Sequence, residues 1–178
     1  MAQVTRFLVS SLLVVSFGRS GQEEILAPYY ETPRLVVDRM LRLGHLKAGE
    51  HMFDLGSGDG RIVIMAAQKY HADATGVELD RALVDQSRKR IGKLRLTGNA
   101  HIVQGDLLKQ DYSSADLITV YLLPIANQRL IPILEKQLKR GARVVSNNSA
   151  LEPWTPSKVE DIEDDREGHS HRIYLYER

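Results

Sequence analysis

A short apolar run followed by three glycines at alternate positions limits the possible folds of this chain more than any other feature. The run is Met52–Leu55, and Gly56, Gly58 and Gly60 come directly after it. From Arg61 to Tyr70 the apolar residues return with helical spacing. A strand, a glycine-rich turn and a helix begin a parallel α/β unit, and backbone without side chains can approach a ligand closely. For the glycines alone, a tight turn with no ligand is the alternative interpretation.

Helical and strand-like segments alternate along the chain, which predicts a parallel sheet covered on both faces. Near the end, two segments with apolar residues at every second position indicate an antiparallel hairpin. We therefore expect an α/β fold with a doubly wound, mostly parallel sheet of about seven strands that ends in this hairpin. The expected helices are Pro33–Leu43, with Thr32 as its cap, Arg61–Tyr70, Arg81–Leu94 and Asn127–Leu138; the expected strands are Met52–Leu55, Ala74–Glu78, Ala100–Val103, Ala115–Leu123 and Ala142–Asn147, and the hairpin joins residues 157–165 to 170–178.

The composition fits one folded domain. Of the 178 residues, 43% are hydrophobic and 26% are charged, and the absence of cysteine excludes disulfides and a thiol nucleophile. Lysine and arginine number 24 against 23 acidic residues, so the net charge of +1 gives no indication of nucleic-acid binding. His169 and His171 would share one face of a hairpin strand, but no further ligand is evident, and we predict no metal site.

The first residues differ from the rest of the chain. An apolar run from Phe7 to Phe17 follows a basic flank and is too short to span a bilayer. We expect residues 1–24 to be a signal-peptide-like or membrane-anchor leader and residues 25–178 to be the folded domain. A helix or strand packed on the domain is the alternative for the leader.

Polar residues stand where the predicted strands end. Asp54 lies in the first strand just before the glycines, Glu78 closes the second, and Asp106 follows the third. The segment from Tyr121 to Pro124 closes the fourth. Ligands of open parallel sheets bind beyond the carboxyl ends of the strands, so these residues predict one shared site. Glu78 is placed to accept hydrogen bonds from ribose hydroxyls, or else to favour the start of the next helix, a role that Asp80 could take instead.

The glycine spacing separates nucleotide cofactors. A dinucleotide site requires G-x-G-x-x-G, whereas this chain has "GSGDG", so NAD is disfavoured. No Lys-Ser or Lys-Thr pair follows the glycines, which excludes a P-loop.

The motifs "FDLGSGDGRIVI", "GVELD", "VQGDLL" and "DLITVYLLP" resemble, in order, those of the class I S-adenosylmethionine-dependent methyltransferases. The segments "APYYETPRLVVDRML", "YLLP" and "HRIYLYE" are similar to the small protein-lysine methyltransferases that include the mitochondrial enzymes acting on the ATP synthase c-subunit and on the adenine nucleotide translocase, with archaeal and bacterial relatives. This resemblance extends from about Ala27 to the end of the chain. It departs at Ser146–Ala150, where such relatives carry a histidine and an acid.

The resemblance implies S-adenosylmethionine as cofactor and a lysine of a protein, possibly membrane-embedded, as methyl acceptor. A cofactor made in the cytosol favours a leader that leaves the enzyme on the cofactor-containing side. The implied catalytic residues are Tyr121 and Pro124, where methyl donor and acceptor meet. The implied cofactor-binding residues are Tyr29 and Thr32, which would cover the cofactor; Asp54, near its amino group; Gly56, Ser57, Gly58 and Gly60, along its methionine part; Glu78, at the ribose; and Asp106 and Leu107, at the adenine.

Three alternatives remain open from the residues alone. They are a methyltransferase for a small molecule or another acceptor, an NAD-type oxidoreductase, and a cofactor-binding module without catalysis. Tyr121 could orient an acceptor amine, or it could be a buried aromatic residue that fills the sheet edge.

Overall fold

The structure is a computed structural model that describes residues 30–163, 165 and 168–178. The predicted leader, residues 1–24, and the predicted cofactor contact Tyr29 lie outside the described residues. Among the described helices, none combines the length and the apolar character needed to cross a membrane.

Seven strands form one sheet in the order β3-β2-β1-β4-β5-β7-β6. The strands β1 to β5 are parallel, and β7 runs antiparallel to both of its neighbours, β5 and β6. This confirms the predicted sheet and its antiparallel end. The strand order reverses between β1 and β4, which places a ligand-binding crevice at the carboxyl ends of these two strands. The strand bounds are β1 His51–Leu55, β2 Asp73–Glu78, β3 Ala100–Gln104, β4 Leu117–Val120, β5 Arg143–Asn147, β6 Lys158–Ile162 and β7 His171–Glu177.

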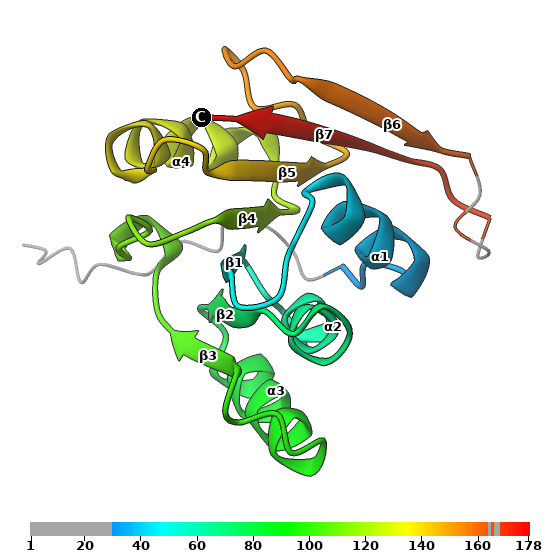
Figure 1. The fold of residues 1–178 in the computed structure, drawn as a ribbon, viewed down its shortest axis with the longest axis vertical. Coiled ribbons are helices and arrows are strands. Elements are labelled where there is room, and N and C mark those ends of the chain that lie inside the picture. The colour runs from blue at the N-terminus through cyan, green and yellow to red at the C-terminus, as the bar shows by residue number, and fades with distance from the viewer. Residues whose placement is uncertain (1–29, 164, 166–167) are drawn as a thin grey trace, which may run out of the picture.

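Helices cover both faces of the sheet (Figure 1). One apolar cluster contains residues of α1, α2 and α3, and a second contains residues of α4 and of the short helix η1. Each cluster packs against one face of the strands, so the sheet is buried on both sides and its central strand β4 is buried throughout. The bounds are α1 Arg34–Leu43, α2 Arg61–Tyr70, α3 Arg81–Lys93, η1 Leu107–Lys109 and α4 Pro124–Gln137.

Three local predictions are wrong. Thr32 does not cap α1; Pro33 is the capping residue, and it has no side-chain hydrogen bond to the helix end. The predicted strand Ala115–Leu123 is shorter, because only Leu117–Val120 pairs in the sheet, and α4 begins at Pro124 rather than Asn127. Proline suits the first turn of a helix because its φ angle is already fixed there. Residues 121–123 are thereby left as a connection at the carboxyl end of β4.

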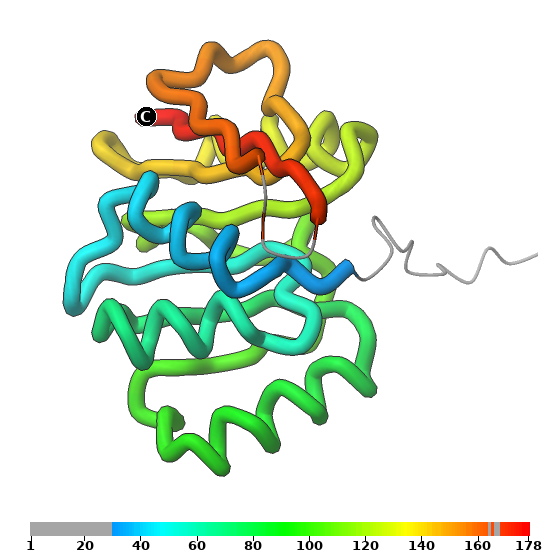
Figure 2. Tube along the Cα trace, turned by 90° about the vertical axis from the view of Figure 1, so that its right-hand side faces the viewer, coloured from blue at the N-terminus to red at the C-terminus, as the bar shows by residue number. Residues whose placement is uncertain are grey.

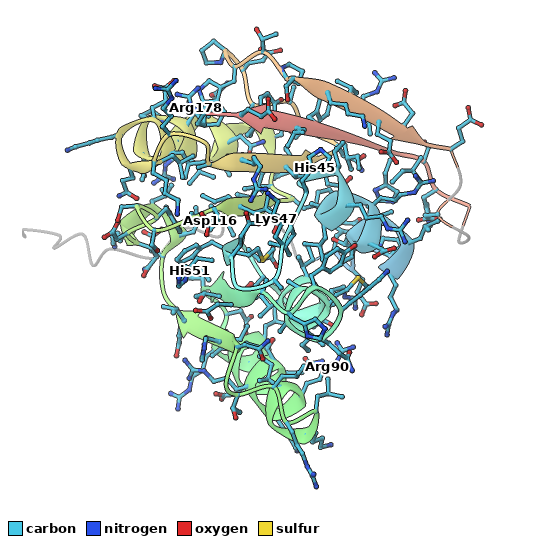
Figure 3. All side chains as sticks on the ribbon, in the orientation of Figure 1. His45, Lys47, His51, Arg90, Asp116 and Arg178 are labelled. Carbon is cyan, nitrogen blue, oxygen red and sulfur yellow. The ribbon has the colours of Figure 1, made fainter. Side chains whose placement is uncertain are left out.

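Ion pairs close the amino ends of the central strands. Arg143 at the start of β5 lies 2.7 Å from the carboxylate of Glu50, and Asp116, just before β4, lies 2.6 Å from Lys139 and accepts a hydrogen bond from the backbone of His51. Figure 3 shows Asp116 and His51 close together at this end. These charges pair with one another, and the predicted site lies at the opposite, carboxyl ends of the strands.

The last strand, β7, lies inside the sheet, between β5 and β6. In Figure 2 α1, in blue, lies beside β7, in red, and the start of α1 comes near Asp165 of the connection from β6 to β7. Pro33 and Arg34 of that start line a cavity of about 720 Å³ together with Asp165 of the connection. The residues of the glycine turn, 54–60, do not line this cavity, whose other lining residues belong to α1 and α2.

Candidate active site

The glycine turn between β1 and α2 is fastened to β2 by its own backbone. Gly56, Gly58 and Gly60 have φ angles of +79°, +53° and +74°, a region that residues with a side chain rarely adopt. The N–H groups of Gly56 and Ser57 both donate to the carbonyl of Val77, at 2.9 and 3.0 Å. The N–H of Gly60 donates to the Ser57 carbonyl at 2.9 Å. These donors are used within the protein, so the turn does not present them as a phosphate cradle.

Ser57 faces the sheet. A Cβ atom placed on Gly76 of β2 would lie 2.5 Å from the Ser57 hydroxyl oxygen, so the serine side chain packs directly over the backbone of Gly76. The hydroxyl is buried and has no hydrogen-bond partner among the described residues. A ligand beyond the turn would therefore meet the backbone of Ser57 rather than its hydroxyl.

Asp54 lies in β1 beneath the turn and is 3% exposed. One carboxyl oxygen accepts a hydrogen bond of 2.7 Å from the hydroxyl of Thr119 on β4. Burial raises the pKa of Asp54 to about 7; the Thr119 hydrogen bond opposes this, and the nearby charges of Glu78 and Asp59 add to it. Near neutral pH this carboxyl is poised between its neutral and its charged form, and a cation beside it would favour the charged form.

Glu78 closes β2, as predicted, and its carboxylate faces the glycine turn. One oxygen accepts from the N–H of Gly58 at 2.7 Å, and the other accepts from the N–H groups of Leu79 and Asp80 at 2.8 and 2.9 Å. The alternative role of Glu78, favouring the start of α3, belongs instead to Asp80, whose side chain accepts from two N–H groups of the first helical turn. Glu78 thus joins the turn to β2 and keeps a negative charge beside it.

Asp59, the acid between the second and third glycines, has a role that was not predicted from the sequence. Its two carboxylate oxygens accept from Arg61 at 2.8 and 2.9 Å, and Arg90 of α3, labelled in Figure 3, donates at 2.8 Å. Burial acts to raise the pKa of Asp59, but the hydrogen bonds and charge of Arg61, joined by Arg90, outweigh it and lower the pKa. A negative charge therefore occupies the start of α2, where a dinucleotide site would hold a phosphate.

Arg61 also connects the glycine turn to the segment before α1. It donates to the carbonyl of Thr32 at 3.1 Å, and it forms an ion pair of 2.9 Å with Glu31. Thr32 is buried. The segment that was predicted to cover the cofactor is thus held beside the turn by the side chain of the first residue of α2.

Asp106 and Leu107 follow β3 at the same edge of the sheet. The Asp106 carboxylate accepts from the N–H of Leu108 at 2.8 Å and caps η1. Leu107 is buried, and its carbonyl accepts a hydrogen bond of 2.6 Å from Tyr112. Since β3 pairs with β2 up to Glu78, both residues lie one strand away from the glutamate, as the shared-site prediction requires.

The connection after β4 completes the site. Leu122 is buried, and one of its methyl carbons lies 3.0 Å from where a Cβ atom of Gly56 would be, so this connection packs against the glycine turn. The hydroxyl of Tyr121 lies 3.4 Å from the side-chain nitrogen of Asn148, and its ring meets the ring of His171 edge-on. Pro124 begins α4 and is exposed. Tyr121 is therefore a partly exposed residue with polar contacts rather than a buried filler of the sheet edge.

Asn127 on α4 and Asn147 at the end of β5 were also not predicted. Both side chains are buried, and neither amide atom of Asn127 nor the amide nitrogen of Asn147 has a hydrogen-bond partner among the described residues. A pattern of sequence spacing gives no indication of such groups, since asparagine is common at helix and strand ends for other reasons. Within the described part of the chain, no group of three histidine or acidic side chains is placed to hold a metal ion.

Known proteins share both the sequence and the fold of this chain. A family model described as the ANTKMT methyltransferase domain matches residues 54–158, more than half of the chain. A protein-lysine N-methyltransferase from Saccharolobus islandicus is 40% identical over 150 residues, which are 84% of this chain and 92% of the relative. A lysine N-methyltransferase for the ATP synthase c-subunit from Homo sapiens is 31% identical over 80% of this chain, which spans 60% of that longer relative.

A solved structure gives the same result for the fold. The crystal structure of an RNA methyltransferase from Salinibacter ruber in complex with S-adenosyl-L-homocysteine matches with a TM-score of 0.78 and 40% identity, over 83% of this chain and 93% of that one. Together these matches identify S-adenosylmethionine as the cofactor of this chain. The chain belongs to the ANTKMT methyltransferase domain family and is an S-adenosylmethionine-dependent methyltransferase.

Proposed function

We propose that the methyl acceptor of this enzyme is a lysine side chain of a protein, and that the residues around the glycine turn act as predicted from the sequence. The observation that carries the acceptor is the match to the Saccharolobus islandicus protein-lysine N-methyltransferase along nearly its whole length. The human relative, a lysine N-methyltransferase for the ATP synthase c-subunit, supports the same class of acceptor.

The charges around the turn fit a cationic cofactor. Asp54 and Glu78 lie beside the glycines, whereas the charge of Asp59 is compensated by Arg61 and Arg90, and several N–H donors of the turn are already used within the protein. A pyrophosphate would meet negative charge and few available donors there, which disfavours an NAD-type oxidoreductase. Bound S-adenosylmethionine supplies a methyl group on a positively charged sulfur. In this proposal Asp54 holds the amino group of the cofactor, and Glu78 accepts from the ribose hydroxyls.

The remaining predicted contacts take their places at the same edge. Asp106 and the Leu107 backbone would face the adenine, because they extend the edge beyond Glu78. Thr32, held by Arg61, would cover the cofactor together with Tyr29. The three glycines, with the Ser57 backbone between them, would lie along the methionine part, where any side chain would intrude.

We call the part of the site around the connection after β4, residues 121–123, the acceptor side. Methyl transfer there requires little acid–base chemistry. A lysine with an ordinary pKa must lose a proton before it attacks, which at neutral pH costs about 4 to 5 kcal/mol. Holding two reacting groups in line contributes roughly 7 to 11 kcal/mol, so orientation outweighs the cost of deprotonation. Tyr121, at the end of β4, is placed to orient the amine through its hydroxyl or through the face of its ring. Pro124 fixes the start of α4 and thereby the path of the connection that carries this tyrosine.

Apolar side chains border the acceptor side. Leu123 and Ile125 stand on either side of Pro124 and are 47% and 60% exposed. Exposed leucine and isoleucine next to a site suit contact with a protein surface better than contact with a nucleic-acid backbone. Attachment to a membrane through residues 7–17 stays a prediction; fractionation of cells that express the full chain would test it.

RNA is the second candidate acceptor, because the Salinibacter ruber structure is described as an RNA methyltransferase. The basic run from Arg88 to Arg95 offers the charge that phosphates bind, but it is partly committed to the fold. Arg88 donates to the carbonyl of Ile102 at 2.7 and 3.1 Å, and Arg90 pairs with Asp59.

Transfer of a radiolabelled methyl group from S-adenosylmethionine to an extract of the native host separates these acceptors. We expect label that resists ribonuclease, is lost with protease and yields methyl-lysine on acid hydrolysis. Label that ribonuclease releases would refute the lysine acceptor. Labelling at the wild-type level by a Glu78→Ala variant would show that the product does not come from this site.

A further inference from the structure

A buried histidine paired with an acid lies at the acceptor side of the sheet. His171 begins β7 and is 8% exposed, and its Nε2 lies 3.2 Å from a carboxylate oxygen of Asp165. The other oxygen of Asp165 accepts from the backbone N–H of His169 at 3.1 Å. A carboxylate only accepts hydrogen bonds, so Nε2 of His171 carries a proton. In the neutral imidazole the lone pair is therefore on Nδ1.

The Nδ1 atom lies near two side-chain amides, one of which presents a hydrogen-bond donor and the other an acceptor. It lies 3.3 Å from the side-chain nitrogen of Asn148, a donor, and 3.2 Å from the side-chain oxygen of Asn147, an acceptor. A neutral imidazole accepts from Asn148. An imidazolium has a proton on Nδ1 and donates to Asn147 instead, so that Asn148 loses this acceptor. The two charge states of His171 thus select different amides.

Asn148 connects this selection to the acceptor side. Its side-chain oxygen accepts from the backbone N–H of Arg172 at 3.0 Å, which fixes the amide with its nitrogen towards His171. The same nitrogen lies 3.4 Å from the hydroxyl of Tyr121, and the ring centroids of Tyr121 and His171 are 6.5 Å apart in an edge-to-face arrangement. The two hydrogens of one amide can therefore hold the imidazole and the phenol together.

We propose that His171 is a positioning residue for methyl transfer: in its neutral form it accepts from Asn148 and helps to hold that amide against the hydroxyl of Tyr121, and in its protonated form it donates to Asn147, so that the Nδ1 hydrogen repels the Asn148 amide and weakens its hold on Tyr121. This inference rests on the proposed function, which places the acceptor amine beside Tyr121. The histidine comes from β7, and the acid that fixes its proton comes from the connection before that strand.

Several charged groups surround the pair. The nearest is Asp165 itself, and the ring of His169 lies 3.5 Å from the same carboxylate. Arg34 and Asp38 of α1 and Lys69 of α2 line the cavity that Asp165 borders. Among the residues that the structure describes, Asp165 is the charged group paired directly with the His171 ring, which makes it the residue to change.

The variant that tests this proposal most directly is Asp165→Asn. The amide oxygen would stay on the N–H of His169, so the amide nitrogen would face Nε2 of His171 as a donor. The neutral ring would then carry its proton on Nδ1 and bond to Asn147, which imitates the protonated state at every pH. We expect kcat to fall about 10- to 100-fold, as misplacement of a reacting group does, while the dissociation constant for S-adenosylmethionine changes less than about twofold. His171→Asn should lose the acidic limb of the kcat profile, and His169→Gln is the control that touches Asp165 but neither Asn148 nor Tyr121.

Nuclear magnetic resonance gives a readout without turnover. In the wild-type protein we expect the nitrogen shifts of neutral His171 to report a proton on Nε2, and the side-chain amide of Asn148 to shift with the same titration midpoint as the ring. That midpoint should match the acidic limb of kcat. The positioning role would be overturned if the chemical shift of the Asn148 side-chain amide did not change as His171 is protonated. A His171→Asn variant with the wild-type pH profile of kcat would also overturn it. If the labelled product proves to be RNA, the lysine acceptor is refuted. The pH profile of kcat for the wild type and the His171→Asn variant is then measured with RNA as the substrate.

Discussion

Replacing Asp54 with a neutral amide tests the electrostatics of the site without changing its shape. The buried carboxyl accepts a hydrogen bond from Thr119, and the amide oxygen of an Asp54→Asn variant can accept the same bond. Burial raises the pKa of Asp54 to about 7 from an ordinary value of 3.8, with the charges of Glu78 and Asp59 adding to the effect. The folded protein therefore holds this proton more tightly than the unfolded chain does.

The sign and size of the effect follow from this difference. A group whose pKa is raised by folding stabilises the folded state fully at a pH below its pKa in the unfolded chain. This stabilisation is lost as the pH rises through its pKa in the folded protein. A difference of about 3 pH units, at about 1.4 kcal/mol for each unit, gives about 4 kcal/mol lost between about pH 4 and about pH 8. Wild type and Asp54→Asn should therefore be equally stable near pH 4, and the variant should be the more stable one near pH 8.

Urea unfolding of both proteins across this pH range measures the difference directly, because the contributions of the other titrating groups largely cancel between them. Asp111→Asn is the control: Asp111 is exposed and hydrogen bonds from Ser113 lower its pKa from the ordinary value of 3.8, so its contribution changes only below about pH 4, and its difference from wild type should stay constant from pH 4 to pH 8. A stability difference between wild type and Asp54→Asn that stays constant from acid to alkaline pH would refute the reasoning.

Three further changes test the turn and its supports. Glu78→Gln should weaken the binding of S-adenosylmethionine about 10-fold or more, because a charged acceptor is lost; an unchanged dissociation constant in calorimetry would remove Glu78 from the site. Gly76→Ala should lower the affinity for the cofactor, and it should lower the free energy of unfolding by about 1 to 3 kcal/mol, because the new Cβ would lie 2.5 Å from the Ser57 hydroxyl oxygen. The control is Gly92→Ala, which should be neutral or stabilising because its Cβ would meet no described atom within 4 Å. Asp59→Ala leaves two arginines without this partner and should reduce stability by about 2 to 4 kcal/mol, so an unchanged urea midpoint would contradict the pairing.

Local patterns predicted most elements of the fold well. The helix Arg61–Tyr70 was placed to the residue, because a glycine turn precedes its apolar repeat. The strand before Pro124 was overextended, because the apolar run continues through Leu122 and Leu123 after pairing stops at Val120. An apolar residue can lie in a sheet or pack against a neighbouring turn, and only the fold decides between them.

Some contacts of the candidate site could likewise be predicted from the sequence, and others could not. The topological rule placed Asp54, Glu78 and Asp106 at one edge, because the end of a parallel strand is visible in the sequence. The partner of Asp59 on α3 is 31 residues away in the chain, and nothing in the spacing indicates it. The approach of His171 to Asn147 depends on the register between β7 and β5, which a short strand pattern does not specify.

The position of β7 between β5 and β6 has a consequence for how the sheet is assembled. Because β6 pairs with the sheet through β7, residues 158–162 lack their partner strand until residues 171–177 have been synthesised. Until then β5 is an open edge with unpaired backbone groups, the kind of surface through which chains associate wrongly. A nascent chain of this protein therefore gains protection against misassembly and its acceptor-side histidine in one late step, when the same strand closes the sheet.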